Sequence, residues 1–239
     1  MTTQRAQHIF HETDHDANRL KLAGLYGRVR ETQDEWIAAH VAGTTVLDVG
    51  AGYGTLTRHL AAAGFSVTAI DLDDESRRRA REWHGIHVLP GDIYATSFAD
   101  ASFDTVILRE VVEHLGFDRA MTEIDRLVRR RVLVFETHLN AIVHVARRIA
   151  GHEEFNPQTV DHYADVLARH GYQVTIVGFC DVIALPLSGG FVSRQLFPRS
   201  PGLQTALLRF DRTLNDWLRV LRAQKPFCWR YLLQGDRAP

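Results

Sequence analysis

The sequence has few cysteines and no long apolar run. Cys180 and Cys228 are the two cysteines among 239 residues, and they lack a Cys-x-x-Cys spacing, so neither a disulfide framework nor a zinc knuckle is indicated. No run approaches the roughly 18 apolar residues of a membrane span, and residues 1–10 are polar. We therefore expect neither a signal peptide nor a membrane span, and the expected location is cytoplasmic.

An excess of charge of one sign is also absent. The chain has 28 Lys and Arg against 29 Asp and Glu, a net charge of −1, so the whole chain is not a polycation suited to nucleic acid. The charges are nevertheless unevenly placed. Residues 185–239 hold nine basic and three acidic residues, a balance of +6, which leaves 19 basic and 26 acidic residues, a balance of −7, for 1–184.

The most informative stretch is 45–54, Thr-Val-Leu-Asp-Val-Gly-Ala-Gly-Tyr-Gly. It begins with an apolar, β-branched run, which is typical of a buried parallel strand. Gly50, Gly52 and Gly54 follow, and a helical pattern begins at Thr55. A strand, a glycine turn and a helix in this order predict the first unit of a nucleotide-binding α/β fold.

Residues 46–54 resemble motif I of the class I S-adenosylmethionine (SAM)-dependent methyltransferases, and the likeness extends over roughly residues 44–180. Asp48 within the strand is part of that motif. The resemblance implies an α/β fold with a Rossmann-like, seven-stranded class I methyltransferase sheet, SAM as cofactor and S-adenosylhomocysteine as product. It places cofactor contacts at Asp48, Gly50, Gly52, Tyr53 and Gly54.

Two acidic residues strengthen this interpretation. Asp71 ends the predicted strand 65–72 and lies 21 residues after Gly50, where a carboxylate can accept both ribose hydroxyls. In the resembled family an acid after the third strand bonds the adenine amino group and its neighbour packs on the ring, roles that Asp92 and Ile93 fit. The remaining residues of the predicted cofactor set are Leu72 and Arg109.

Four segments are predicted. They are an N-terminal helical cap at 1–43, the SAM-binding α/β core at 44–180, a helical insertion or lid at 181–226 and the last strand with a tail at 227–239. Within the core and tail, helices are predicted at 121–130 and 160–169, and strands at 103–108, 132–135, 172–179 and 227–233.

Catalytic residues are expected just after the fourth strand. Glu110, Glu113 and His114 stand at i, i+3 and i+4, one face of a helical turn. His114 is the first candidate for a general base, because an imidazole titrates near working pH, with Glu113 beside it. His152, before the last core helix, is a second candidate base. The alternative is that the turn only caps the strand and positions the cofactor.

The same turn supports a metal hypothesis. Glu-x-x-Glu-His resembles a turn of quinone-ring O-methyltransferases and of small-RNA 3′-terminal 2′-O-methyltransferases, where it contributes to a divalent-metal site. Glu110, Glu113 and His114 would be ligands here, and a metal would acidify an acceptor hydroxyl. Candidates for a further ligand are His138, His144 and His152. The downstream motif of the RNA enzymes has no good match in this chain.

A helix is predicted near the C-terminus from an apolar stripe with steps of three and four residues. Arginines 209, 212, 219 and 222 decorate its other side. The helix would cover the substrate pocket, form a homodimer interface, or make a peripheral membrane contact through 201–223. Contact with phosphate or RNA is the least favoured alternative, because few aromatics cluster there and no lysine-rich run occurs. The stripe consists of Leu203, Leu207, Phe210, Leu214, Trp217 and Leu221.

The predicted function is SAM-dependent methyl transfer, to oxygen on a small molecule, with no nucleic-acid partner. The alternatives are a metal-assisted methyltransferase acting on a quinol or an RNA 3′ end, and a SAM-binding sensor or partner protein without transfer.

Overall fold

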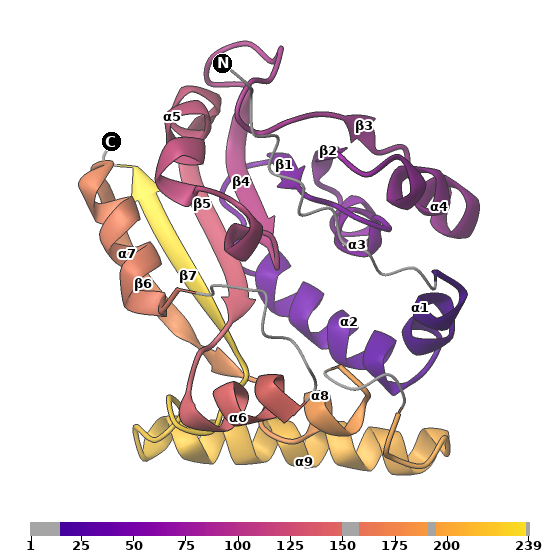
Figure 1. Ribbon diagram of the computed structural model, residues 1–239. Helices are drawn as coiled ribbons and strands as arrows, with labels where there is room; N and C mark the ends of the chain where they lie inside the picture. Colours follow the sequence, from indigo (N-terminus) through magenta and orange to yellow (C-terminus); the bar gives the residue numbers. More distant parts are fainter. Residues whose placement is uncertain (1–14, 150–157, 191–194, 238–239) are drawn as a thin grey trace.

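The computed structural model describes residues 15–149, 158–190 and 195–237. Its helices and strands alternate along the chain (Figure 1). The strands are β1 Thr45–Val49, β2 Ser66–Asp71, β3 Leu89–Pro90, β4 Phe103–Arg109, β5 Val128–Thr137, β6 Tyr172–Cys180 and β7 Arg230–Arg237. The helices are α1 His15–Leu22, α2 Leu25–Ala38, α3 Thr55–Ala62, α4 Asp74–His84, the 3-10 turn η1 Val112–His114, α5 Phe117–Leu127, α6 Ala141–Ile149, α7 Val160–Arg169, α8 Ala184–Leu187 and α9 Pro201–Val220.

All seven strands form one sheet in the order β3-β2-β1-β4-β5-β7-β6. The first five in this order are parallel, whereas β7 runs antiparallel between β5 and β6. The predicted fold class is therefore confirmed, including the antiparallel last strand and the helices that precede it. The strand order changes direction at β1 and β4, and ligands bind at the carboxyl ends of strands beside such a point.

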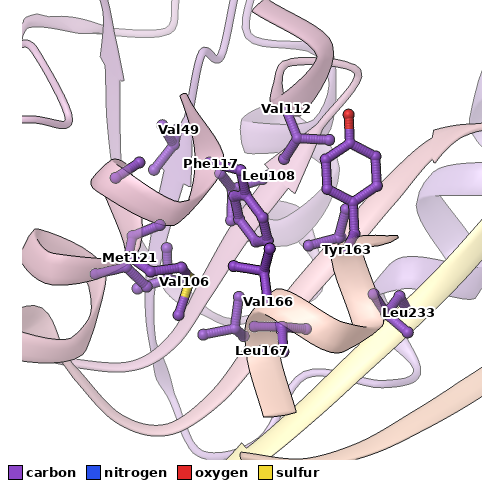
Figure 2. Packing of buried hydrophobic residues seen from close by; sticks show 14 of the residues in the cluster. Val49, Val106, Leu108, Val112, Phe117, Met121, Tyr163, Val166, Leu167 and Leu233 are labelled. Carbon is purple, nitrogen blue, oxygen red and sulfur yellow. The ribbon is translucent and has the colours of Figure 1, made fainter. Parts of the chain in front are cut away.

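The core consists of two apolar layers, one on each face of the sheet. Because side chains alternate along a strand, Val106 and Leu108 pack with α5 and α7, while Ile107 packs with α2 and α3. Figure 2 shows the first layer, in which Phe117 and Met121 of α5 meet Val166 and Leu167 of α7. Burial on both faces explains why β4 is apolar almost throughout.

Several predicted boundaries are wrong. The helix predicted at 121–130 spans Phe117–Leu127, and the strand predicted at 132–135 spans Val128–Thr137. The next arginines belong to the strand because Asp104 and Asp236 pair with them. The last strand begins at Arg230 rather than 227, because the Trp229 amide donates to the Cys180 and Asp181 carbonyls and closes a turn.

The predicted helical segments on either side of the core are present. Two N-terminal helices, α1 and α2, precede β1, and α8 and α9 lie between β6 and β7. In Figure 1 the carboxyl ends of β4 and β5 point towards the layer formed by α2, α6 and α9. Among the described residues, no helix has the length and apolarity that crossing a membrane requires.

Candidate active site

The glycine loop after β1 exposes bare backbone at the carboxyl edge. Gly50, Gly52 and Gly54 all have positive φ, a conformation that residues with a Cβ rarely adopt. A Cβ at Gly50 would meet the Val111 side chain at 2.7 Å, whereas one at Gly52 would have no atom within 4 Å. The loop thus needs glycine for its turn, and the backbone of Gly52 borders open space that a ligand can fill.

Asp71 links this loop to the end of β2. Its Oδ2 accepts from the Gly52 amide at 2.7 Å and its Oδ1 from the Asp73 amide at 2.8 Å. Burial raises the pKa of the carboxyl, while these two amide bonds act in the opposite direction. Each carboxylate oxygen has a second lone pair with which it can accept a ligand hydroxyl.

Three predicted cofactor residues differ in their surroundings. Leu72 has a 66% exposed side chain directly after β2, which suits an apolar contact with a ring. Asp92 is exposed and accepts from the Tyr94 amide at 3.0 Å. Ile93, in contrast, is buried in the main core. The exposed pair can therefore meet a ligand directly, while Ile93 supports the site from within.

Asp48 is buried behind the glycine loop. It is 1% exposed, and its Oδ2 accepts from the Thr57 hydroxyl at 2.6 Å. Burial raises the pKa of this carboxyl to about 6. The Thr57 bond fastens β1 to the first turn of α3, so Asp48 fixes the shape of the loop.

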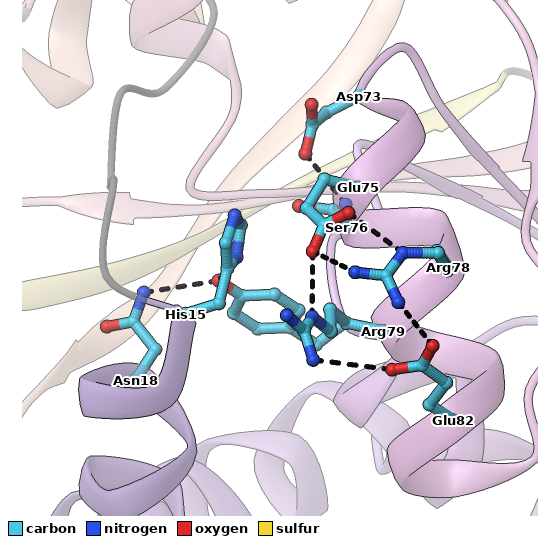
Figure 3. Close-up of polar contacts among 9 residues, drawn as sticks. His15, Asn18, Asp73, Glu75, Ser76, Arg78, Arg79 and Glu82 are labelled. Carbon is cyan, nitrogen blue, oxygen red and sulfur yellow. Dashed lines mark hydrogen bonds and ion pairs between the residues drawn. The ribbon is translucent and has the colours of Figure 1, made fainter.

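Tyr53 connects the glycine loop with the N-terminal cap. Its hydroxyl accepts from Asn18 of α1 at 3.1 Å and lies 2.9 Å from the His15 Nδ1 (Figure 3). Its ring packs on Trp83 of α4, with centroids 4.7 Å apart. Figure 3 also shows the ion pairs of Glu75 and its neighbours along the outside of α4. The cap therefore contacts the loop through a predicted cofactor residue.

Arg109, also predicted to bind the cofactor, is instead directed at the cap. It is 5% exposed at the end of β4, donates to the Gln33 Oε1 at 2.9 Å and pairs with Asp34. Both partners belong to α2. Gln33 in turn donates to Asp181 at 2.6 Å. Arg109 thus holds α2 on the carboxyl edge.

Glu110, a predicted metal ligand, lies between two arginines. Its carboxylate pairs with Arg30 of α2 at 2.5 Å and with Arg230 of β7, and Arg230 also donates to the Thr137 hydroxyl at 2.5 Å. These charges hold the pKa of Glu110 far below its ordinary value despite burial. We call Arg30, Glu110 and Arg230 the arginine–glutamate triad.

The backbone explains how Glu110 reaches α2. Side chains alternate along a strand, so Arg109 and Glu110 would point to opposite faces. Glu110 has a left-handed backbone with φ of +52°, which is uncommon for a residue with a side chain. This turn brings both consecutive side chains to α2. Such strain persists only where the surroundings enforce it, as two ion pairs do here.

Glu113 and His114 form the other half of the predicted catalytic turn. They belong to η1, are mostly buried, and their Oε1 and Nε2 atoms are 3.7 Å apart. Glu110 does not join them, and across the described ranges no three His, Cys, Asp or Glu side chains gather as metal ligands do. His138 packs against Phe179, His144 is exposed on α6, and His152 lies outside the described residues.

A further carboxyl was not predicted from the sequence. Glu136 at the end of β5 is 1% exposed, and within the described part of the chain no hydrogen-bond partner reaches its Oε2. Burial first, and then the nearby Glu113, raises its pKa to about 8. Tyr231, its partner in the β5–β7 register, is also buried with an unpaired hydroxyl among the described residues. This end of β5 therefore presents a neutral carboxyl beside Glu113.

Comparisons with known proteins agree with this geometry. The model of the methyltransferase domain family matches residues 47–135. The chain is 32% identical over 184 residues to a malonyl-[acyl-carrier protein] O-methyltransferase of Pectobacterium atrosepticum, covering 69% of this chain and 72% of that protein. It is 27% identical over 174 residues to an rRNA methyltransferase of Streptomyces thermotolerans, covering 71% of this chain and 50% of that protein.

The chain spans half or less of the length of the first three curated relatives that it matches, 40%, 23% and 50%. Among solved structures it resembles a SAM-dependent methyltransferase from Archaeoglobus fulgidus, with a TM-score of 0.64 and 14% identity. That match covers 88% of this chain and 94% of the other. At this identity the likeness supports the fold.

Proposed function

This chain belongs to the class I SAM-dependent methyltransferase family, and we propose that it transfers the SAM methyl group to an oxygen of a small-molecule acceptor. The family assignment rests on the Pectobacterium relative and on the methyltransferase domain match. The oxygen acceptor is supported by that relative, an O-methyltransferase. The net charge of −1 favours a small molecule over a nucleic acid.

The residues at the β1–β2 edge fit SAM. The open space at Gly52 admits the cofactor against bare backbone, and the paired oxygens of Asp71 can accept its ribose hydroxyls. Leu72 and Asp92, both exposed, suit the adenine ring and its amino group. This half of the site is the observation that carries the proposal. When bound, SAM supplies a methyl group already activated on its sulfonium.

The task of this chain is then to align the acceptor, exclude water and remove a proton where the acceptor is a hydroxyl. We assign proton removal to His114, with Glu113 3.7 Å away to stabilise the imidazolium. His152 stays a candidate base, and the triad and Arg109 position α2 over the site.

A divalent metal is not part of the proposal, because Glu110 is paired with Arg30 and Arg230 and is held away from Glu113 and His114. The partner proposed is the acceptor itself. A homodimer interface at α9 stays a prediction.

The test begins with calorimetric titration of the purified chain with SAM and with S-adenosylhomocysteine. We expect binding of both, and no heat with either would contradict SAM binding. A panel of hydroxyl, carboxyl and amine acceptors is then scored by homocysteine release after enzymatic cleavage of the product. Turnover confined to amines would contradict the oxygen acceptor.

The proton-removing role has its own readout. His114→Gln should abolish the dependence of kcat on deprotonation near neutral pH while leaving SAM affinity unchanged. His144→Gln, on the exposed side of α6, is the matched control. An unaltered pH profile in His114→Gln would transfer the role to another group.

A further inference from the structure

The helix α9 displays an apolar strip to solvent. Leu203, Phe210, Trp217 and Leu221 recur on one side of the helix and are 51%, 58%, 61% and 54% exposed. They are four of the six residues of the predicted stripe. An exposed strip of this kind on a folded chain marks a contact surface.

A different side of α9 packs against the rest of the molecule. Leu207 packs in a cluster with α2 and α8, and Leu218 is also buried. Asp211, though charged, is on this buried side because its Oδ1 accepts the Ile183 and Ala184 amides at 2.6 and 2.8 Å. Those bonds fix the rotation of α9 and leave the strip exposed. In Figure 1 the helix α9 itself forms the outer layer of the molecule.

The exposed apolar side chains of the molecule are concentrated here. Eleven large hydrophobic residues are exposed in the described ranges, and nine of them belong to α6 or to 196–227. Val220 and Phe227 extend the strip at its C-terminal end, and Ile142 and Val145 lie on α6. Scattered single residues would need no explanation, but this concentration does.

Exposed arginines lie on the other side of α9 from the strip. Arg209, Arg212, Arg219 and Arg222 are exposed, and the one exposed acid of α9, Asp216, pairs with Arg219 at 3.0 Å. The exposed sides of α9 and its C-terminal end therefore carry four positive charges against one negative charge. A helix with exposed Trp and Phe on one side and arginines on the other has the composition of interfacial helices that lie on anionic membranes.

We propose that α9 docks the protein on the surface of an anionic phospholipid bilayer. Phe210 and Trp217 enter the boundary between headgroups and acyl chains, and the four arginines bind lipid phosphates. A second copy of this chain fits less well, because its own α9 carries the same excess of arginines and offers no further negative charge to pair with them. Docking places the carboxyl edge of β4 and β5 near the bilayer (Figure 1), and it does not depend on which acceptor is methylated.

The experiment is co-sedimentation of the full chain with vesicles of phosphatidylcholine alone and of phosphatidylcholine with phosphatidylglycerol. We expect binding to the anionic vesicles with a blue shift of the tryptophan fluorescence, and Trp217→Ser should reduce this shift. Salt at 0.5 M should weaken the binding, because the Debye length falls from about 10 Å at 0.1 M to roughly 4 Å. Phe210→Ser with Trp217→Ser should weaken partitioning by about tenfold or more. Arg209→Gln and Arg212→Gln should each weaken it roughly fivefold.

Matched controls come from elsewhere on the surface. Leu20→Ser removes an exposed apolar residue of α1, and Arg169→Gln removes an exposed arginine of α7, and both should bind vesicles like the parent. Thermal unfolding and light scattering accompany every variant. No binding to anionic vesicles, or equal binding by the strip variants, would overturn the proposal. So would a dimer in the parent that the strip variants dissociate, or capture of an RNA oligomer through the same arginines.

Because vesicle binding is measured without SAM, its outcome is independent of the methyl-transfer assay. Loss of docking with intact turnover on a soluble acceptor would contradict this inference alone.

Discussion

The two halves of the carboxyl edge are built in different ways. At β1 and β2 a carboxylate bonds backbone amides that are 19 and two residues away in sequence, and the glycine loop borders open space. At β4, β5 and β7 the contacts are ion pairs between side chains, separated by 80 and 120 residues. The first half presents backbone to a ligand, whereas the second joins the cap, the core and the last strand.

This difference separates binding from positioning. Backbone amides and glycines at the β1–β2 half form a surface that a cofactor can complete. The ion pairs at the β4–β7 half already satisfy their own charges, so their effect on chemistry acts through the placement of α2. Variants in the first half should therefore alter affinity for SAM, and variants in the triad should alter stability first.

The largest effect is expected for Glu110→Ala. Removing this carboxylate leaves Arg30 and Arg230 without their shared partner in a mostly buried place, which costs about 3 kcal/mol of unfolding free energy. Urea denaturation measures the loss. Asp118→Ala, which breaks the exposed pair with Arg169, should leave the midpoint unchanged. Equal midpoints for both variants would contradict a stabilising role of the triad.

A smaller effect, on the affinity for SAM rather than on stability, is expected for Asp71→Asn. The amide keeps the shape of the side chain but loses the charge and one acceptor oxygen, so SAM binding should weaken by about 2 kcal/mol, or roughly 30-fold. Calorimetric titration gives the dissociation constant. Asp74→Asn, with a 93% exposed side chain on the same turn, is the control. An unchanged constant in Asp71→Asn would remove Asp71 from the cofactor site.

The strand, the glycine loop and the place of Asp71 in the first half can be predicted from the sequence because their signals are local. Gly50, Gly52 and Gly54 follow the strand directly, and Asp71 lies at a fixed spacing after one strand-helix unit. Alternation and helical periodicity likewise predict the elements and the fold class. Local patterns do not predict a boundary that a tertiary contact decides. The start of β5 is such a boundary, because Asp104 and Asp236 pair with arginines at the beginning of that strand.

The second half could not be predicted in this way. Nothing near Glu110 in the sequence indicates that Arg30 and Arg230 will meet it, so local spacing alone favours a metal-ligand role for its carboxylate. Glu136 carried no local signal, because its raised pKa results from burial that only the assembled sheet produces. For α9, periodicity predicted the helix but not its rotation, which the bonds of Asp211 to α8 determine.

The pH dependence of stability distinguishes Glu136 from the ionised carboxylates. Its pKa is about 8 in the folded chain and near 4.3 when unfolded, so between these values the folded state holds a proton that the unfolded state lacks. This contribution is fully present below about pH 4.3 and is lost as pH rises through 8. From pH 6 to 7 the parent should lose about 1.4 kcal/mol relative to Glu136→Gln. Denaturation series at several pH values measure this, and parallel curves would show that Glu136 is ionised when folded.

The smallest effect tests how the cap closes on the glycine loop. Tyr53→Phe removes the hydroxyl that accepts from Asn18 and contacts His15, which should cost about 1 kcal/mol. Because these bonds hold α1 and not the core, hydrogen exchange should rise in α1 while β1 stays protected. Tyr26→Phe, which loses a bond from Arg30 in the other half, should leave α1 exchange unchanged. If both variants loosen α1 equally, the cap responds to the two halves as one unit, and the division between a binding half and a positioning half fails.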